Sequence, residues 1–154
     1  MATLPGVAKS FMSDEDKFQF VDTNILVYAY DRTAGHKFMI ANQLLQQLWR
    51  NQNGCISIQV LQEFTYTITR KVKVPLSDAV TKSVVIEYAK WRVFSPKVED
   101  LCMAIDIQQR YQLAFWDALI VHSAASLSCE ILWSEDLNSG QQFADLEVRN
   151  PFLT

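Results

Sequence analysis

The stretch FVDTNILVYAYD, residues 20–31, breaks an apolar run with three consecutive polar residues, Asp22, Thr23 and Asn24. The residues before them have the aromatic and β-branched character of a buried strand, and a helix is expected to start near Thr23. The polar residues therefore either cap a helix or hold a carboxylate where a buried strand ends. Ligand sites of open α/β sheets lie beyond the carboxyl ends of the strands, which makes Asp22 a candidate site residue.

The same alternation of strand and helix recurs along the chain. Short apolar runs predict strands at 18–21, 54–57, 91–94, 130–133 and 146–149, and each but the last precedes a stretch with helical character. Helix starts are indicated at Ser57, at Ser77 and at Ser95, which Pro96 follows. This alternation predicts an α/β fold with a mainly parallel sheet and helices on both faces.

Helical spacing groups the apolar residues of two of these stretches. Val60, Phe64 and Ile68 share one face of the helix after Ser57, and Leu101 and Ile105 share one face of the helix after Pro96.

Length and composition indicate one ordinary globular domain. The chain has 154 residues, of which 49% are hydrophobic and 20% are charged. We assign 1–17 to an N-terminal arm without predicted structure and 18–154 to the folded domain.

No stretch has the pattern of a membrane span or a signal peptide, so a cytoplasmic location is expected. A net charge of −3 argues against a surface that attracts nucleic acid everywhere, but it allows a local basic path.

Several common functional motifs are missing. Cys55, Cys102 and Cys129 are widely spaced and are interpreted as small buried hydrophobic residues. Four glycines leave no Walker A and no GxGxxG motif. His36 and His122 lack the spacing of metal ligands, and His122 is interpreted as a helix residue with a satisfied partner.

The remaining candidates are carboxylates. Asp136 follows the strand at 130–133, Asp117 lies in the first turn of a helix, and Glu63 lies about one turn into the helix after Ser57. Each has an ordinary explanation alone, as a cap, a first-turn acid, a turn residue or a solvated residue. Together with Asp22, however, they are predicted to meet at one edge of the sheet.

Such a meeting of acids has an energetic cost. Two carboxylates about 4 Å apart repel each other by about 4 kcal/mol at a surface-like dielectric. Mg²⁺ or Mn²⁺ removes this cost, takes oxygen ligands and retains waters, one of which can attack a phosphorus. The predicted cluster therefore indicates hydrolysis of phosphodiesters.

Four motifs in order carry a family resemblance: FVDTNILVYAYD, ISIQVLQEF, FWDALIVHSA and ILWSEDLNSGQ, closed by VRNPF. Over about residues 18–152 the chain resembles the PIN-domain ribonucleases, most closely the VapC-type toxins of toxin–antitoxin pairs. The resemblance implies a Rossmann-like α/β/α sandwich and a Mg²⁺- or Mn²⁺-dependent endoribonuclease. It assigns the catalytic and metal-binding positions to Asp22, Glu63, Asp117 and Asp136.

The resemblance also implies supporting residues and partners. Thr23, Asn24 and Ser134 are expected to support the site, with Ser134 keeping the hydroxyl of a threonine that the family often has there. A homodimer is expected, and so is a cognate antitoxin that inserts a segment, often with an arginine, among the carboxylates. A guanidinium group pairs bidentately with carboxylates, so such an insertion would block the site.

Other interpretations stay open. Arg70 and Lys71 are candidate RNA contacts, but cations at a solvated helix end explain them equally well. An aspartate-nucleophile phosphatase usually has a second aspartate two positions after the first, where this chain has Asn24. A non-catalytic scaffold that binds a partner through the pocket is the third alternative.

Overall fold

The protein is built on a mixed six-stranded sheet. A computed structural model describes residues 13–153. The strand order is β3-β2-β1-β4-β6-β5, and every neighbouring pair is parallel except β5 and β6. The strands are β1 (Gln19–Val21), β2 (Gly54–Ser57), β3 (Arg92–Phe94), β4 (Ile131–Trp133), β5 (Gln142–Phe143) and β6 (Leu146–Arg149). The predicted α/β class and the five predicted strands are confirmed, and β5 is an addition.

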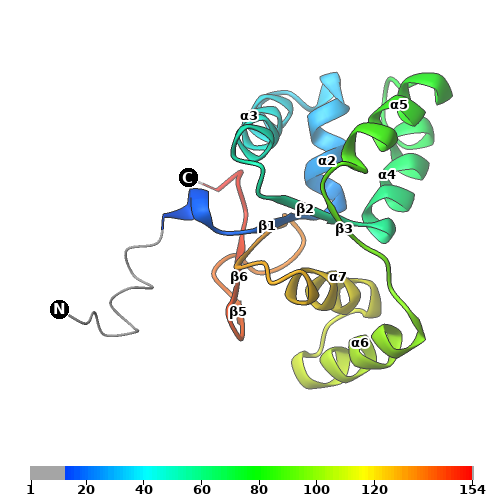
Figure 1. Cartoon of the computed structure of the whole chain (residues 1–154). Coiled ribbons are helices and arrows are strands. Elements are labelled where there is room, and N and C mark those ends of the chain that lie inside the picture. Colours follow the sequence, from blue (N-terminus) through cyan, green and yellow to red (C-terminus); the bar gives the residue numbers. More distant parts are fainter. Residues whose placement is uncertain (1–12, 154) are drawn as a thin grey trace.

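Helices cover both faces of this sheet, as Figure 1 shows. On one face lie α2 (Thr23–Tyr30), α3 (His36–Asn51), α4 (Ile58–Arg70) and α5 (Asp78–Tyr88). On the other face lies α7 (Phe115–Ser126), with α6 (Val98–Tyr111) packed against its outer side. Two short 3₁₀ helices, η1 (Asp14–Asp16) and η2 (Arg32–Ala34), complete the helical elements of the described residues. The Rossmann-like α/β/α sandwich is therefore confirmed.

The helix starts follow local side-chain chemistry. Asp22, Ser57 and Ser77 each cap a helix by accepting a hydrogen bond from a backbone amide, as predicted for the two serines. The predicted start of α6 at Ser95 is wrong by two residues. The helix begins after Lys97, because the Asp100 carboxylate accepts a hydrogen bond from the Lys97 amide at 2.7 Å and fixes the first turn there.

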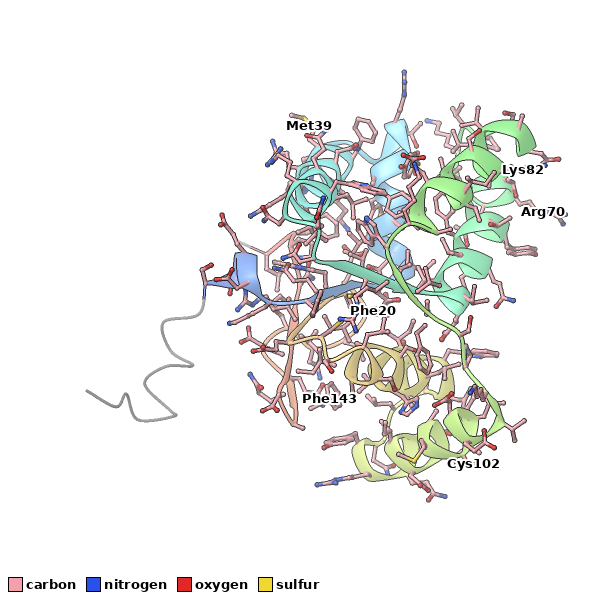
Figure 2. All side chains as sticks on the ribbon, viewed as in Figure 1. Phe20, Met39, Arg70, Lys82, Cys102 and Phe143 are labelled. Atoms are coloured by element: carbon pink, nitrogen blue, oxygen red, sulfur yellow. The ribbon has the colours of Figure 1, made fainter. Side chains whose placement is uncertain are left out.

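The core fills the two spaces between the sheet and its helices. Phe20 lies in the central strand and is fully buried (Figure 2), as are Val60, Phe64 and Ile68 on the inner face of α4. The seven residues from 118 to 124 are all buried, because α7 lies between the sheet and α6. Only Ala104 of α6 is buried, so α6 contributes little to the core.

This position of α6 overturns one prediction. Cys55 and Cys129 are buried as expected, but Cys102 is exposed on α6. The Leu101 and Ile105 side chains are also exposed, because α6 packs through its opposite face. His122 behaves as predicted: its Nε2 lies 2.8 Å from Asp100 Oδ1, so the histidine joins α7 to α6.

Residues 13–17, which were assigned to the arm, contact the domain. The Asn53 side-chain amide donates to the carbonyl oxygens of Glu15 and Lys17, and Arg149 forms an ion pair with Asp14 at 2.7 Å. Residues 1–12 of the assigned arm lie outside the described residues. Within residues 13–153, no helix combines the length and apolar character needed to cross a membrane.

Candidate active site

Asp22 lies at the carboxyl end of the central strand and is almost fully buried. Its backbone amide donates to the Trp133 carbonyl of β4 at 2.9 Å, which fixes the residue between two parallel strands. Oδ1 accepts from the Thr23 amide at 2.7 Å, and Oδ2 accepts from the Ser134 hydroxyl at 2.7 Å. The carboxylate therefore caps α2 and also faces the crevice beyond the strand ends.

Ser134 organises the loop that follows β4. It is fully buried, and its Oγ accepts from the amides of Asp136 at 3.2 Å and Leu137 at 3.4 Å while it donates to Asp22. The hydroxyl thus ties the backbone that carries Asp136 to the Asp22 side chain. This arrangement explains why a hydroxyl is useful at position 134.

Asn24 joins the same two acids from α2. Its Nδ2 lies 3.0 Å from Asp136 Oδ2 and 3.4 Å from Asp22 Oδ2, and its Oδ1 accepts from the Glu135 amide at 3.1 Å. The side chain amide therefore bridges carboxylates that are more than a hundred residues apart in sequence. The structure brings Asp22 and Asp136 to one edge of the sheet, as the sequence predicts.

Glu63 and Asp117 come from α4 and α7, and the other acids influence both electrostatically. Partial burial is the main cause that raises the pKa of the Glu63 carboxyl, and the charges of Asp117 and Asp136 raise it further. Burial also raises the pKa of Asp117, with the Asp136 charge as the second cause. Glu63 and Asp117 are therefore near enough to Asp136 for the charges to act on one another, and their part in a common site stays a prediction.

The charge of this site is not neutralised by the chain. Burial raises the pKa of Asp22 to about 7, with smaller contributions from Asp136 and Glu63, although the hydrogen bonds from Ser134 and Thr23 lower it. Within the described residues, none of the ion pairs includes any of the four acids. A bound cation would therefore stabilise the ionised form of the site.

The donor set fits a hard divalent cation. It consists of carboxylate and hydroxyl oxygens, which Mg²⁺ and Mn²⁺ prefer. The buried Thr23 hydroxyl has no partner at hydrogen-bond distance within the described residues, although it is close enough to Glu63 to lower the pKa of that carboxyl, so a metal-bound water could satisfy it. In residues 13–153, no three acid, histidine or cysteine side chains form a ready-made metal shell. A bound ion would consequently keep several waters or draw the side chains inward.

Sequence reasoning missed a tether on the outer side of the site. The Glu135 carboxylate accepts from the Tyr28 hydroxyl at 2.6 Å and forms an ion pair with Lys37. The Lys37 ammonium also lies 4.9 Å from the centre of the Tyr28 ring and 5.3 Å from that of Phe152. Only the position of Glu135 between Ser134 and Asp136 could have drawn attention to it.

The two candidate RNA contacts do not lie among the acids. Arg70 ends α4, seven residues after Glu63, which is roughly 10 Å along a helix axis. Its guanidinium and the Lys71 ammonium lie 5.4 and 5.7 Å from the centre of the Tyr66 ring. Their role in RNA binding stays a prediction.

The family model of the PIN domain matches residues 20–145 of the chain. No curated protein matches the sequence.

Solved structures with the same fold share little sequence with this chain. A toxin–antitoxin complex from Klebsiella pneumoniae matches with a TM-score of 0.63 and 19% identity, over 87% of this chain and 98% of that one. VapBC2 from Rickettsia felis, bound to a DNA fragment from its promoter, matches with a TM-score of 0.61 and 18% identity, over 86% of this chain and 98% of that one. VapC20 from Mycobacterium tuberculosis, a toxin that cleaves the sarcin–ricin loop, matches with a TM-score of 0.59 and 18% identity, over 77% of this chain and 91% of that one.

Proposed function

Because the chain belongs to the PIN domain family, we propose that it is an endoribonuclease that uses Mg²⁺ or Mn²⁺ to hydrolyse RNA phosphodiester bonds. The observation that carries the proposal is the pairing of buried Asp22 with Asp136 through Ser134 and Asn24, with Glu63 near enough for its charge to raise the pKa of Asp22. This edge of a parallel sheet is the usual place for a ligand site, and the chain itself leaves the charge there uncompensated.

The side chains of the site would have different roles in such a reaction. Asp22, Glu63, Asp117 and Asp136 are the groups that would hold the ion. When bound, the ion activates a water and stabilises charge that develops on the phosphate oxygens. Ser134 and Asn24 keep Asp22 and Asp136 in a fixed orientation, and the Asp22 carboxyl, whose pKa burial raises to about 7, can exchange protons near neutral pH.

We further propose that the protein is the toxin of a type II toxin–antitoxin pair and acts in the cytoplasm. Support comes from the fold, which it shares with toxins in the Klebsiella pneumoniae and Rickettsia felis complexes. An antitoxin segment that carries an arginine would satisfy the unpaired carboxylates and exclude the metal. A cognate antitoxin should therefore inhibit cleavage, and that inhibition should weaken when its arginine is replaced.

A homodimer is part of the same proposal. The outer face of α6 exposes Val98, Leu101 and Ile105, which follow helical spacing and lie opposite the face that packs on α7. An apolar stripe of this kind favours burial against a second copy. Light scattering of the chain and of Leu101→Lys tests it: the variant should be monomeric, and a monomeric parent chain would contradict the proposal.

Cleavage of total cellular RNA tests the function directly. Asp22→Asn and Asp117→Asn should each lower metal-dependent cleavage by at least about a hundredfold, because each removes a charged oxygen ligand. Their circular dichroism should match that of the parent chain. Asp106→Asn is the matched control, since Asp106 is exposed on α6 and lies outside the cluster.

The control should keep full activity. Equal cleavage by Asp22→Asn and the parent chain would rule out the nuclease. A titration that shows no binding of Mg²⁺ or Mn²⁺ would instead favour a non-catalytic scaffold. If the parent chain cleaves RNA, the cut sites identify the substrate.

A further inference from the structure

We propose that single-stranded RNA follows the face of α4 from Glu63 to Arg70, with bases stacked on Tyr66 and Trp116 and phosphates held by Arg70 and Lys71. The inference rests on the proposed nuclease function and names the surface that would bring RNA to the acidic site. We call this surface, formed by Tyr66, Arg70, Lys71 and Trp116, the aromatic path.

Tyr66 provides the first stacking surface. Its side chain is 54% exposed, although tyrosine usually buries most of its ring. The Arg70 guanidinium and the Lys71 ammonium both lie near the ring, at 5.4 and 5.7 Å from its centre. Aromatic rings beside cations are a common arrangement in proteins that bind single-stranded nucleic acid, because bases stack on rings while cations contact phosphates.

Helix geometry connects Tyr66 to the catalytic site. Glu63, Tyr66 and Arg70 are three and four residues apart, so they lie on one face of α4. Tyr66 is roughly 5 Å and Arg70 roughly 10 Å beyond Glu63 along the helix axis. An RNA strand held at the acidic site therefore has a base and a phosphate contact within the next few nucleotides.

Trp116 provides a second stacking surface at the site itself. It is 63% exposed, immediately precedes Asp117 and begins α7 together with Phe115. Its carbonyl accepts from the side-chain amide of buried Gln59 at 3.2 Å, which fixes Trp116 to the first turn of α4. An exposed indole one residue before a candidate metal-binding carboxylate offers a surface on which a base near the cleaved phosphate can stack.

The charges also favour RNA. The acidic site by itself repels a polyanion, so cations are needed nearby to bring RNA in. Within the described residues, none of the ion pairs includes Arg70, Lys71 or Lys82. Arg70 and Lys82 come from the neighbouring helices α4 and α5, on the same side of the protein (Figure 2), and both line a groove of about 850 Å³ between these helices.

An alternative occupant of this surface is a second copy of the chain, because the groove also contains Leu61 and Ile86. The cations beside the exposed Tyr66 ring, which belong to no ion pair within the described residues, favour RNA over an apolar partner. The two occupants differ in what they require at the rings. Stacking needs an aromatic side chain, whereas apolar burial accepts leucine.

Binding of short random-sequence single-stranded RNA, measured in EDTA with the Asp22→Asn chain, tests the aromatic path without cleavage. Tyr66→Leu and Trp116→Leu should each weaken binding by roughly 5- to 150-fold, the range expected for loss of one base–aromatic stack. Tyr66→Phe and Trp116→Phe should bind nearly as well as the parent. RNA that contains 5-bromouridine should form photo-crosslinks to Tyr66 and Trp116.

The cations have a matched control. Arg70→Ala should reduce the slope of log affinity against log salt by about 0.7, the value for one phosphate contact to a single strand. Arg50→Ala should not change the slope, although Arg50 is likewise an exposed cation in the last turn of its helix. Light scattering on every variant shows whether the oligomeric state changes.

The outcomes separate this inference from the proposed function. If the parent chain cuts RNA but the leucine variants bind RNA like the phenylalanine variants, the aromatic path is wrong and the nuclease stands. If the leucine variants alter only the oligomeric state, the surface belongs to a second copy. If the parent chain cuts no RNA with either metal, the proposed function fails.

Discussion

At the scale of single residues, Asp22 determines most of the chemistry of the site. It is buried and makes hydrogen bonds through both carboxylate oxygens, yet no ion pair within the described residues neutralises it. Burial is the largest cause that raises its pKa to about 7. Asp22 is therefore partly protonated near neutral pH in the absence of a cation.

This pKa predicts an unusual dependence of stability on pH. The Asp22 pKa is about 7 in the folded chain and near 3.8 when unfolded, so the folded state binds more protons between these pH values. Without divalent metal, the free energy of unfolding should fall as the pH rises from about 4 to about 7, by up to about 4 kcal/mol from this group. Urea unfolding in EDTA across this pH range measures the effect.

Asp22→Asn should largely remove this decline and stabilise the metal-free chain at about pH 8. Asp106→Asn serves as the comparison, because Asp106 is exposed. A decline that is identical in Asp22→Asn and the parent would contradict the assignment of the raised pKa to this carboxyl.

At the scale of elements, the loop after β4 is held from two sides. Ser134 and Asn24 hold it on the side of Asp22, and Glu135 holds it on the other side through Tyr28 and Lys37. The loop carries Asp136, so its position determines how closely that carboxylate approaches the others. The two partners of Glu135, Tyr28 and Lys37, come from α2 and α3, so the tether connects the site to the helices on one face of the sheet.

Loss of the tether should affect activity more than stability. Lys37→Met keeps the aliphatic stem but removes the charge, and it should lower metal-dependent cleavage by about ten- to a hundredfold through displacement of Asp136. The free energy of unfolding should fall by only about 1 kcal/mol, as is typical of a partly exposed ion pair. Cleavage rates at increasing Mn²⁺ and urea unfolding provide the two measurements.

Lys90→Met is the control for this change, because Lys90 pairs with Glu87 on the surface, away from the acids. Lys37→Arg should restore most of the activity. If Lys37→Met cleaves RNA at the parent rate, the tether does not position Asp136.

A second element-scale prediction concerns the packing of β2. A Cβ atom at Gly54 would lie 2.7 Å from the ring of Trp91, which itself packs against Trp49 and Tyr88. Gly54→Ala should therefore lower the free energy of unfolding by about 1–3 kcal/mol, because the ring has to shift within a packed aromatic cluster. Urea unfolding followed by tryptophan fluorescence measures this change.

The replacement Trp91→Phe tests whether the clash with the Trp91 ring causes the loss of stability in Gly54→Ala. It shortens the side chain, so Gly54→Ala should cost less in that background than in the parent. An equal cost in both backgrounds would show that the clash with Trp91 is not the reason.

At the scale of the whole molecule, the carboxylates of the site repel one another, and a bound cation would reduce this repulsion. Mn²⁺ that binds only the folded chain should stabilise it by about 2.7 kcal/mol at a hundred times its dissociation constant. For a domain of this length, that corresponds to a rise in Tm of roughly 5–10 °C. Scanning calorimetry at about pH 8 should show the rise in the parent and in Asp106→Asn, but only a small rise in Asp22→Asn. An equal rise in all three chains would place the ion elsewhere.

The sequence by itself determined the five parallel strands of the sheet, but not β5, and the polar residues at the strand ends. These features are predictable because they depend on neighbouring residues. Residues 18–21 form a strand, for example, and Asp22 follows it directly, where the first amide of the next helix needs a cap. The helix caps Ser57 and Ser77 follow from the same local chemistry. Even the meeting of Asp22 and Asp136 followed, because parallel strands end at one edge.

Only the tertiary structure decided which side chains touch. The Asn24 bridge to Asp136 and the Glu135 contact with Lys37 join residues about a hundred positions apart, and no local pattern specifies such distances. The exposure of Cys102 was equally hidden, because the spacing of apolar residues on α6 does not show which face meets α7. Local sequence fixes the conformation of each element, whereas contacts across the chain depend on how all the elements pack together.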